Sequence, residues 1–371
     1  MTKENYFCIL KGMVLNDEKT GNSGFALPLL LIVVIIAAIS AIGVNIFFQN
    51  TSKSNSEIIT DLKKNIAVNP PTPSPVPFKE LTIPYLRERN YESTFGALEK
   101  VRDRGSYSGY LTSFDSEGFK VNTYLAIPTG DTPPGGFPAV VFVHGYIPPA
   151  QYRTLVNYDS YVDNLASRGL VVAKIDLRGH AESEGQAFGG YYSGDYVIDT
   201  LNAYSALQKL DVVNPGKVGL WGHSMAGNIT FRAFVAKNIP KLVIWAGAVY
   251  TYEDMQEFRI ADNSYQPPPQ ESERQKYRDE LFAAHGRFSP DSEFWKTVVP
   301  TNYLEGVEGE IQIHHAVDDG VVSIGYSRNL VEILNRAGID NLLIEYPSGG
   351  HNLTGTSFTK AMESTSLFLK N

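Results

Sequence analysis

Short apolar runs of the kind found in buried strands recur along the chain between residues 139 and 346. There are six: Ala139–Val143, Leu170–Ile175, Val218–Trp221, Leu242–Ala246, Ile311–His314 and Leu342–Tyr346. Patterns typical of amphipathic helices, such as Tyr196–Leu210 and Gly325–Arg336, lie between most of them. Strands buried on both faces that alternate with helices form parallel sheets with helices on both sides. The pattern therefore predicts an α/β fold.

Two further strands are predicted ahead of these runs. Tyr107–Phe114 and Phe119–Ile127 flank the turn-forming segment Asp115–Gly118, which is a hairpin signal. We therefore expect a mostly parallel eight-stranded sheet with antiparallel strands at one edge. This domain should cover residues 81–371.

Residues 251–300 interrupt the alternation of strands and helices. The segment is polar, rich in Glu, Arg and Tyr, and contains Pro267–Pro269. Connections between a strand and the next helix are normally short, so a segment of this length needs an explanation. We expect a helical cap or lid over the site, and a surface excursion without a role is the alternative.

Residues 25–48 form a long apolar stretch, and no charge occurs between Lys19 and Lys53. As a helix, this stretch would reach about 36 Å, enough to cross a hydrocarbon core of roughly 30 Å. A buried soluble helix would carry a polar stripe, and this one has none. We therefore expect a transmembrane helix at 25–48, a polar tail at 1–24 and a Pro/Ser-rich linker at 49–80.

The flanks of this stretch bear on orientation and processing. Lysines are equal in number on its two sides, so charge gives no orientation. A short tail ahead of a single span favours an extracytoplasmic catalytic domain.

A cleaved signal peptide would have a shorter apolar region. The junction Gly24-Phe25 resembles a type IV prepilin cleavage site, although Leu29 stands where such segments carry Glu, so processing at Gly24 is a separate hypothesis.

Composition narrows the function classes. The net charge is −8 and no long basic run occurs, which argues against nucleic-acid binding. Cys8 is the only cysteine, so an intrachain disulfide is impossible. Neither CxxC nor HExxH spacing occurs, so we expect no metal and no other cofactor. The sequence leaves the oligomeric state open.

The segment Gly222–Gly227 reads GHSMAG and is centred on Ser224. A G-x-S-x-[GA] pattern is expected by chance about 0.3 times in a chain of this length, so it is weak alone. Here it follows a predicted strand and precedes a predicted helix, the context that a nucleophile elbow requires. The usual second glycine is replaced by Ala226. We predict that Ser224 is the nucleophile, and a serine in an ordinary helix N-terminal turn is the alternative.

A serine hydroxyl needs a general base, and histidine is the common choice. In this type of site the chain order is Ser, then acid, then His. His351 follows the last predicted strand in the loop Ser348–His351, so we predict that His351 is the base. His314 and His315 end an earlier strand, at the place where the acid is expected next.

The acid must orient the histidine. Asp318 and Asp319 both follow the strand Ile311–His314, and we predict Asp318 as the acid. Asp319 and the earlier pair Glu253 and Asp254 are the alternatives. We expect Asp319 to hold the loop through backbone amides instead.

An oxyanion hole requires two backbone N–H groups. One should be that of Met225, directly after the nucleophile. The other should come from the loop His144–Tyr146, and we predict Tyr146 N–H. Gly145 beside it would let the backbone approach the site.

These motifs together resemble the α/β-hydrolase superfamily, and most closely the prolyl-oligopeptidase-type (S9) serine hydrolases with their dienelactone-hydrolase and acetyl-esterase relatives. The matching segments are VVFVHGY (140–146), DLRGHAESEG (176–185), GHSMAGN (222–228), HHAVDDGVV (314–322) and YPSGGH (346–351). The resemblance implies a Ser-Asp-His triad and an acyl-enzyme intermediate. It also implies that the element with Asp176, Arg178 and His180 fixes a loop, and a role facing the substrate is the alternative.

The resemblance leaves the substrate open. Peptidases of this type that are restricted to short peptides carry a β-propeller before the hydrolase domain, whereas only about 80 residues precede it here. The leading hypothesis is a membrane-anchored serine hydrolase acting on a small ester or a peptide, either an S9-like peptidase or a carboxylesterase. The alternative of another class is a non-catalytic, membrane-anchored binding module on a hydrolase scaffold.

Overall fold

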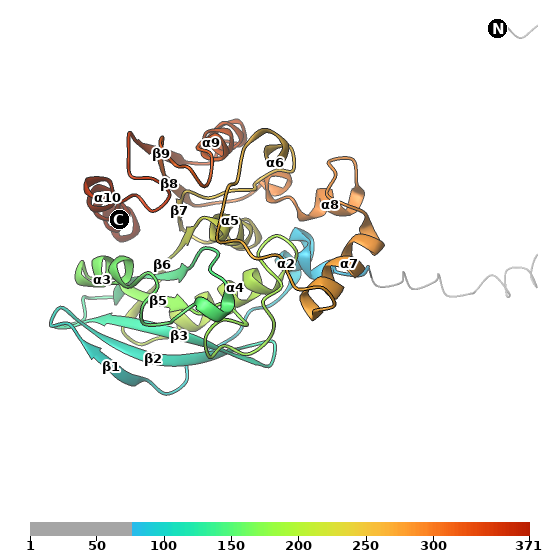
Figure 1. The fold of residues 1–371 in the computed structure, drawn as a ribbon. Coiled ribbons are helices and arrows are strands. Elements are labelled where there is room, and N and C mark those ends of the chain that lie inside the picture. Colours follow the sequence, from blue (N-terminus) through green and yellow to red (C-terminus); the bar gives the residue numbers. More distant parts are fainter. Residues whose placement is uncertain (1–75) are drawn as a thin grey trace, which may run out of the picture. The chain divides into compact units, whose positions relative to one another are not determined.

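A computed structural model of the chain describes residues 76–371. Figure 1 shows a central twisted sheet with helices on both of its faces. The α/β fold predicted from the apolar runs is therefore confirmed. The predicted tail (1–24), transmembrane helix (25–48) and linker as far as residue 75 lie outside the described residues. Within 76–371, no helix is both long enough and apolar enough to cross a membrane.

The sheet of the described domain has nine strands. They are β1 (Glu99–Asp103), β2 (Tyr107–Ser116), β3 (Phe119–Pro128), β4 (Phe137–Val143), β5 (Val171–Ile175), β6 (Val213–His223), β7 (Lys241–Trp245), β8 (Glu310–Ala316) and β9 (Asn341–Tyr346), in the order β1-β2-β3-β5-β4-β6-β7-β8-β9. The pairs among β1, β2, β3 and β5 are antiparallel. All pairs from β5 across to β9 are parallel, so the sheet is largely parallel as predicted.

The prediction of eight strands was one too few, because it lacked β1. This strand reads EKVRD, pairs only with β2, and has no buried residue. An exposed edge strand needs no apolar face, and charged side chains on it discourage pairing with another chain. Its sequence therefore carries no hydrophobic period from which it could be predicted.

Helices cover the two faces of the sheet. One face is covered by α2 (Ile83–Glu88), α4 (Asp195–Gln208), α5 (Met225–Ala236) and α9 (Gly325–Ala337), and the other by α3 (Asp159–Ser167) and α10 (Thr356–Lys370). Successive residues of a strand point to opposite faces. On β4, Val141 and Val143 therefore pack into the first layer, whereas Val140 and Phe142 pack into the second.

The segment between β7 and β8 contains three helices, which Figure 1 shows in pale brown to orange. They are α6 (Asp254–Glu257), α7 (Glu273–His285) and α8 (Glu293–Val298), followed by the 3-10 turn η3 (Pro300–Tyr303). A separate small apolar cluster joins α7 and α8 to Leu81, in the turn η1 (Lys79–Leu81). The Phe78 ring also meets the Tyr277 ring edge-on, with centroids 5.2 Å apart. The start of the folded domain is thus packed against this insertion.

Candidate active site

Ser224 stands at a sharp turn between β6 and α5. Its φ of 56° and ψ of −121° give Ser224 a positive φ that non-glycine residues rarely adopt. Its backbone N–H donates to the Trp245 carbonyl oxygen at 2.9 Å, which ties the turn to β7. This is the strand–turn–helix geometry of a nucleophile elbow, which holds the serine side chain clear of the sheet.

Crowding inside the turn explains the small residues around Ser224. A Cβ added to Gly222 would lie 2.5 Å from the Ala226 carbonyl oxygen and 2.5 Å from Thr230 Oγ1, so only glycine fits there. Ala226 itself is fully buried, and the fold accommodates its methyl group in place of the usual glycine. The departure of the motif from the standard pattern therefore leaves the turn intact.

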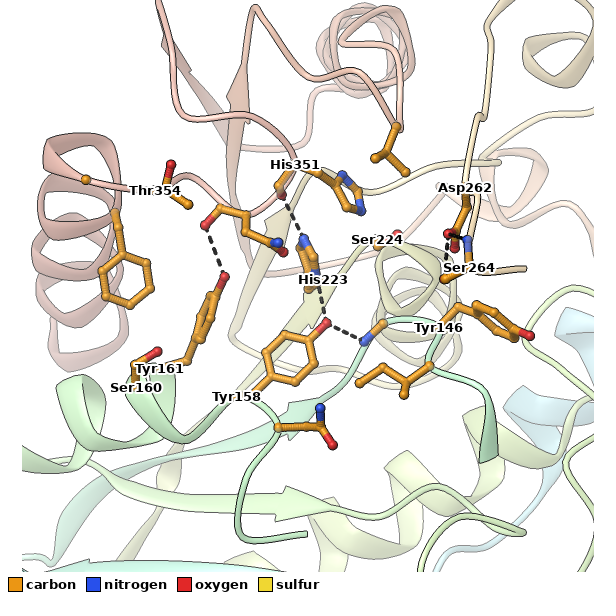
Figure 2. Close-up of a pocket in the computed structure, with 17 residues that line it drawn as sticks. Tyr146, Tyr158, Ser160, Tyr161, His223, Ser224, Asp262, Ser264, His351 and Thr354 are labelled. Atoms are coloured by element: carbon orange, nitrogen blue, oxygen red, sulfur yellow. Dashed lines mark hydrogen bonds between the residues drawn. The ribbon is translucent and has the colours of Figure 1, made fainter. Parts of the chain in front are cut away.

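His351 reaches the same place from the loop between β9 and α10. The side chains of Ser224 and His351 both line a cavity of about 690 Å³, and Figure 2 shows them on its wall. No residue in the described range forms a hydrogen bond with the Ser224 hydroxyl. Contacts between a catalytic serine and its base are often long until a substrate binds.

The acid that contacts His351 is Asp319, and the prediction of Asp318 is corrected. Asp319 Oδ2 lies 2.8 Å from His351 Nδ1. The Asp318 carboxylate is exposed and accepts hydrogen bonds from the backbone N–H groups of Gly349 and Gly350, at 3.3 and 2.8 Å. The backbone turn after β8 sends the first side chain to the loop that carries His351 and the second one inward, which two adjacent aspartates in a sequence do not disclose.

Asp319 is held in place by further donors. Its Oδ1 accepts from the backbone N–H groups of Val321 and Val322, at 2.8 and 3.0 Å. Burial raises the pKa of this carboxyl, but hydrogen bonds from His315, His351 and the backbone outweigh burial and leave the pKa well below its ordinary value. Asp319 is therefore a carboxylate at neutral pH, able to orient an imidazole and to stabilise its charged form.

His315 supports this arrangement and was not assigned a role from sequence. Its Nε2–H faces both Asp319 Oδ2 at 3.2 Å and the Val322 carbonyl oxygen at 3.0 Å, while Nδ1 accepts from the Ser327 hydroxyl at 2.7 Å. Because a carbonyl can only accept, the proton is on Nε2. The alternation of side chains along β8 could have indicated a separate role for His315, because it places His315 and His314 on opposite faces of the sheet.

The two predicted oxyanion donors flank Ser224. Within the described domain, no acceptor takes a hydrogen bond from the backbone N–H of Tyr146 or of Met225. Gly145 permits the close approach of the first donor, because an added Cβ would lie 3.0 Å from the His223 carbonyl oxygen and 3.2 Å from Ser224 Cβ. Two N–H groups without an acceptor near Ser224 are compatible with an oxyanion hole.

A chain of hydrogen bonds, marked in Figure 2, links the three loops of the site. Gly145 N–H donates to the Tyr158 hydroxyl at 3.0 Å, and this hydroxyl lies 2.7 Å from His223 Nδ1. His223 Nε2–H in turn donates to the His351 carbonyl oxygen at 2.9 Å. Burial, with a smaller effect of nearby His351, lowers the pKa of His223 to about 3. The ring is therefore neutral, and Tyr158 is its donor.

The loop element with Asp176, Arg178 and His180 is largely structural. Arg178 is buried and pairs with Asp199, its Nε lying 2.9 Å from Oδ2 and its Nη2 2.6 Å from Oδ1. Asp176 accepts from the Tyr152 hydroxyl at 2.7 Å. His180 differs, because it lines a second cavity of about 210 Å³.

The second cavity meets the first at Ser224, which lines both. The insertion between β7 and β8 contributes Tyr265, Arg274 and Arg278 to its wall. The predicted cap segment therefore forms part of the site. The described part of the chain contains no group of three or more His, Cys, Asp or Glu residues that could hold a metal ion.

Comparison with known proteins agrees with this geometry. Residues 137–266 match a family model described as serine aminopeptidase, S33. This segment runs from β4 through the elbow and into the insertion. The chain has an α/β-hydrolase fold. The prediction of a hydrolase enzyme is supported by the family model and by the relatives that follow.

One curated relative of this chain is the uncharacterized peptidase YuxL of Bacillus subtilis, 24% identical over 245 residues. The match covers 65% of this chain but only 35% of the relative, so the chain spans about a third of that protein's length.

Solved structures show the same fold. Acetyl xylan esterase 1 from Thermoanaerobacterium has a TM-score of 0.54 at 18% identity, covering 81% of this chain and 95% of the esterase. A puromycin-hydrolyzing peptidase of Mycobacterium tuberculosis has a TM-score of 0.53 at 17% identity, covering 72% of this chain and 40% of the peptidase. Esterases and peptidases thus share this architecture.

Proposed function

We propose that this α/β-hydrolase cleaves an ester or peptide bond through an acyl-enzyme formed on Ser224, with His351 as the general base and Asp319 as the orienting acid. The observation that carries the proposal is the contact between the buried Asp319 carboxylate and His351 Nδ1, in a cavity shared with a serine at a nucleophile elbow. Because Nδ1 is bound to the acid, Nε2 is the nitrogen left to exchange a proton with Ser224.

The reaction follows from these positions. Ser224 Oγ attacks the substrate carbonyl carbon while its proton passes to His351 Nε2. The negative oxygen of the tetrahedral intermediate accepts hydrogen bonds from Tyr146 N–H and Met225 N–H. His351 then gives the proton to the departing alcohol or amine, which leaves Ser224 acylated. A water molecule attacks the acyl carbon with His351 again as base, and the carboxylic acid and free Ser224 are released.

Activity-based labelling tests the proposal. A fluorophosphonate should label the wild-type chain at Ser224 and leave Ser224→Ala unlabelled. His351→Ala should lower the hydrolytic rate by several orders of magnitude, roughly 10⁵-fold, because base and nucleophile act as a unit. A wild type that fails to label, or a Ser224→Ala variant that labels equally, would sink the proposal and revive the non-catalytic binding module.

The choice between esterase and peptidase is tested separately. Amide cleavage requires protonation of a poor leaving group, so an enzyme that has the triad can still be restricted to esters. Rates on p-nitrophenyl acetate and on short peptide amides should be compared for the same preparation. Amide turnover within about 100-fold of ester turnover would identify a peptidase.

The membrane anchor at 25–48 and an extracytoplasmic catalytic domain stay proposals from the sequence. The apolar run without charges supports the first. The full-length chain should fractionate with membranes after a high-salt wash, and a chain starting at residue 76 should not. Protease digestion of intact cells should then remove the catalytic domain.

A further inference from the structure

Two arginines of the insertion converge on the cavity of about 210 Å³ beside Ser224. Arg274 and Arg278 are four residues apart on α7, so they occupy the same face of the helix, and both line this cavity. The Nη2 atoms of both lie 3.8 Å from the position that a Cβ on Gly189 would take. The two guanidinium groups therefore come together at one point in the wall.

Neither arginine has an acidic partner in the described domain. The ion pairs of residues 76–371 leave out Arg274 and Arg278, and the Nε atoms of both are buried without a hydrogen-bond partner. Arg278 is 8% exposed; it donates to the Tyr265 hydroxyl at 3.0 Å, and its guanidinium carbon lies 3.9 Å above the Tyr192 ring. These neutral contacts hold the side chain in place without neutralising its charge.

Such an arrangement is unfavourable unless an anion completes it. An arginine stays charged in proteins, and a buried charge is costly when it is unpaired. The carboxylate that does line the cavity, Asp262, accepts hydrogen bonds from the backbone N–H and hydroxyl of Ser264, at 2.8 and 2.6 Å, and makes no ion pair with either arginine. The positive charge of the two arginines is thus available to bind a negative group that enters the cavity from the side of Ser224.

We infer that this cavity binds a carboxylate of the substrate, so that the enzyme prefers acidic esters or acidic peptides over neutral ones. The inference rests on the proposed serine hydrolase function. A carboxylate is the anionic group that both substrate classes carry, and the planar fork of a guanidinium matches it. The cavity is small and its walls include Tyr191 and Tyr192, so a short acidic group fits it.

Competition with fluorophosphonate labelling tests the inference without requiring the natural substrate. Monomethyl glutarate and its neutral counterpart methyl 4-carbamoylbutanoate differ only in a carboxylate against an amide. The acidic compound should slow the labelling of Ser224 at a concentration about ten-fold or more below the concentration of the amide that has the same effect. Hydrogen bonds between charged groups are stronger than those to a neutral amide. A second pair, 4-acetoxybutanoate and 4-acetoxybutanamide, places the acid on the leaving-group side.

Variants of α7 assign the effect to its arginines. We compare how strongly the acidic and the neutral compound protect Ser224 from labelling. This ratio should fall in Arg274→Gln and in Arg278→Gln, and Arg274→Lys should restore part of it. Arg287→Gln is the matched control, since Arg287 is an exposed arginine of the same insertion outside both cavities. It should leave the ratio unchanged. A thermal unfolding scan identifies any variant that has lost its fold.

The outcomes separate the inference from the function on which it rests. If Ser224 does not label at all, the serine hydrolase proposal fails. If Ser224 labels but acid and amide protect equally in both pairs, the hydrolase stands and the carboxylate site is wrong. Acid-selective protection that survives Arg274→Gln and Arg278→Gln alike would also overturn the assignment to these two residues.

Discussion

Asp319 Oδ2 lies 2.8 Å from His351 Nδ1, and the Asp319 side chain is fully buried whereas that of His351 is 15% exposed. A fully buried carboxylate in contact with this largely buried imidazole fixes the ring in one orientation. Its other nitrogen is then left for the cavity that Ser224 also lines. The adjacent Asp318 faces outward and holds only the backbone of the loop that carries His351.

The two neighbouring aspartates should therefore differ sharply when they are neutralised. Asp319→Asn should lower kcat by roughly 10³ to 10⁴-fold, because the imidazole loses the partner that fixes its tautomer and stabilises its charge. Asp318→Asn keeps an acceptor for Gly349 and Gly350 and should cost less than about ten-fold. Steady-state kinetics on one ester substrate measures both. A larger loss for Asp318→Asn than for Asp319→Asn would contradict the geometry.

Residues that belong to a sequence motif could be predicted. Residues that matter only through their position in the folded chain could not. The positions of Ser224 at a sharp turn and of His351 beside the same cavity could be predicted, because the strand–turn–helix pattern and the chain order constrain them. The choice between Asp318 and Asp319 depends on one backbone turn, which no pattern encodes. Tyr158 belongs to no motif, and the exposed strand β1 has no hydrophobic period. The insertion could be located by its length and polarity, but its arginines could not be placed in a cavity.

Tyr158 should act as a positioning residue for the site. Its hydroxyl accepts from Gly145 N–H beside the predicted oxyanion donor and lies 2.7 Å from His223 Nδ1. Tyr158→Phe leaves both groups unpaired, and we expect kcat to fall about ten-fold with little change in KM, because the transition state is affected more than substrate binding.

The control for this change is Tyr204→Phe, since within residues 76–371 the hydroxyl of Tyr204 on α4 forms a hydrogen bond only with Gln208. It should leave kcat and KM unchanged. A fall in kcat of equal size for both variants would show that loss of a hydroxyl acts through general stability. A rise in KM alone for Tyr158→Phe would place Tyr158 in substrate binding instead.

From the geometry of the turn at Ser224, we expect substitutions of Gly222 and Ala226 to have opposite effects on activity. Gly222→Ala introduces a Cβ 2.5 Å from two oxygen atoms, so the turn must shift and labelling of Ser224 should be lost or strongly slowed. Ala226→Gly restores the usual glycine, and we expect activity to be kept with a loss of about 1 kcal/mol in stability for glycine in a helix. Thermal unfolding and labelling rates measure both. A fully labelled Gly222→Ala variant would disprove the crowded turn.

Buried neutral histidines should make the protein less stable as the pH falls. Burial lowers the pKa of His314 to about 3, from an ordinary value of 6.5, and its nitrogens contact Tyr346 and Gln312. Below pH 6.5 the unfolded chain takes up a proton at this residue and the folded chain does not, so the free energy of unfolding decreases. Its contribution should fall by roughly 1 to 2 kcal/mol between pH 6.5 and 5.

His314→Gln removes this titrating group and lies away from Ser224. The variant should be less stable than wild type at pH 8, because its hydrogen bonds are lost, but its melting temperature should fall less steeply between pH 6.5 and 5. Thermal unfolding followed by circular dichroism over this range gives the two slopes. Parallel slopes would mean that His314 is protonated in the folded protein at these pH values, in conflict with its complete burial.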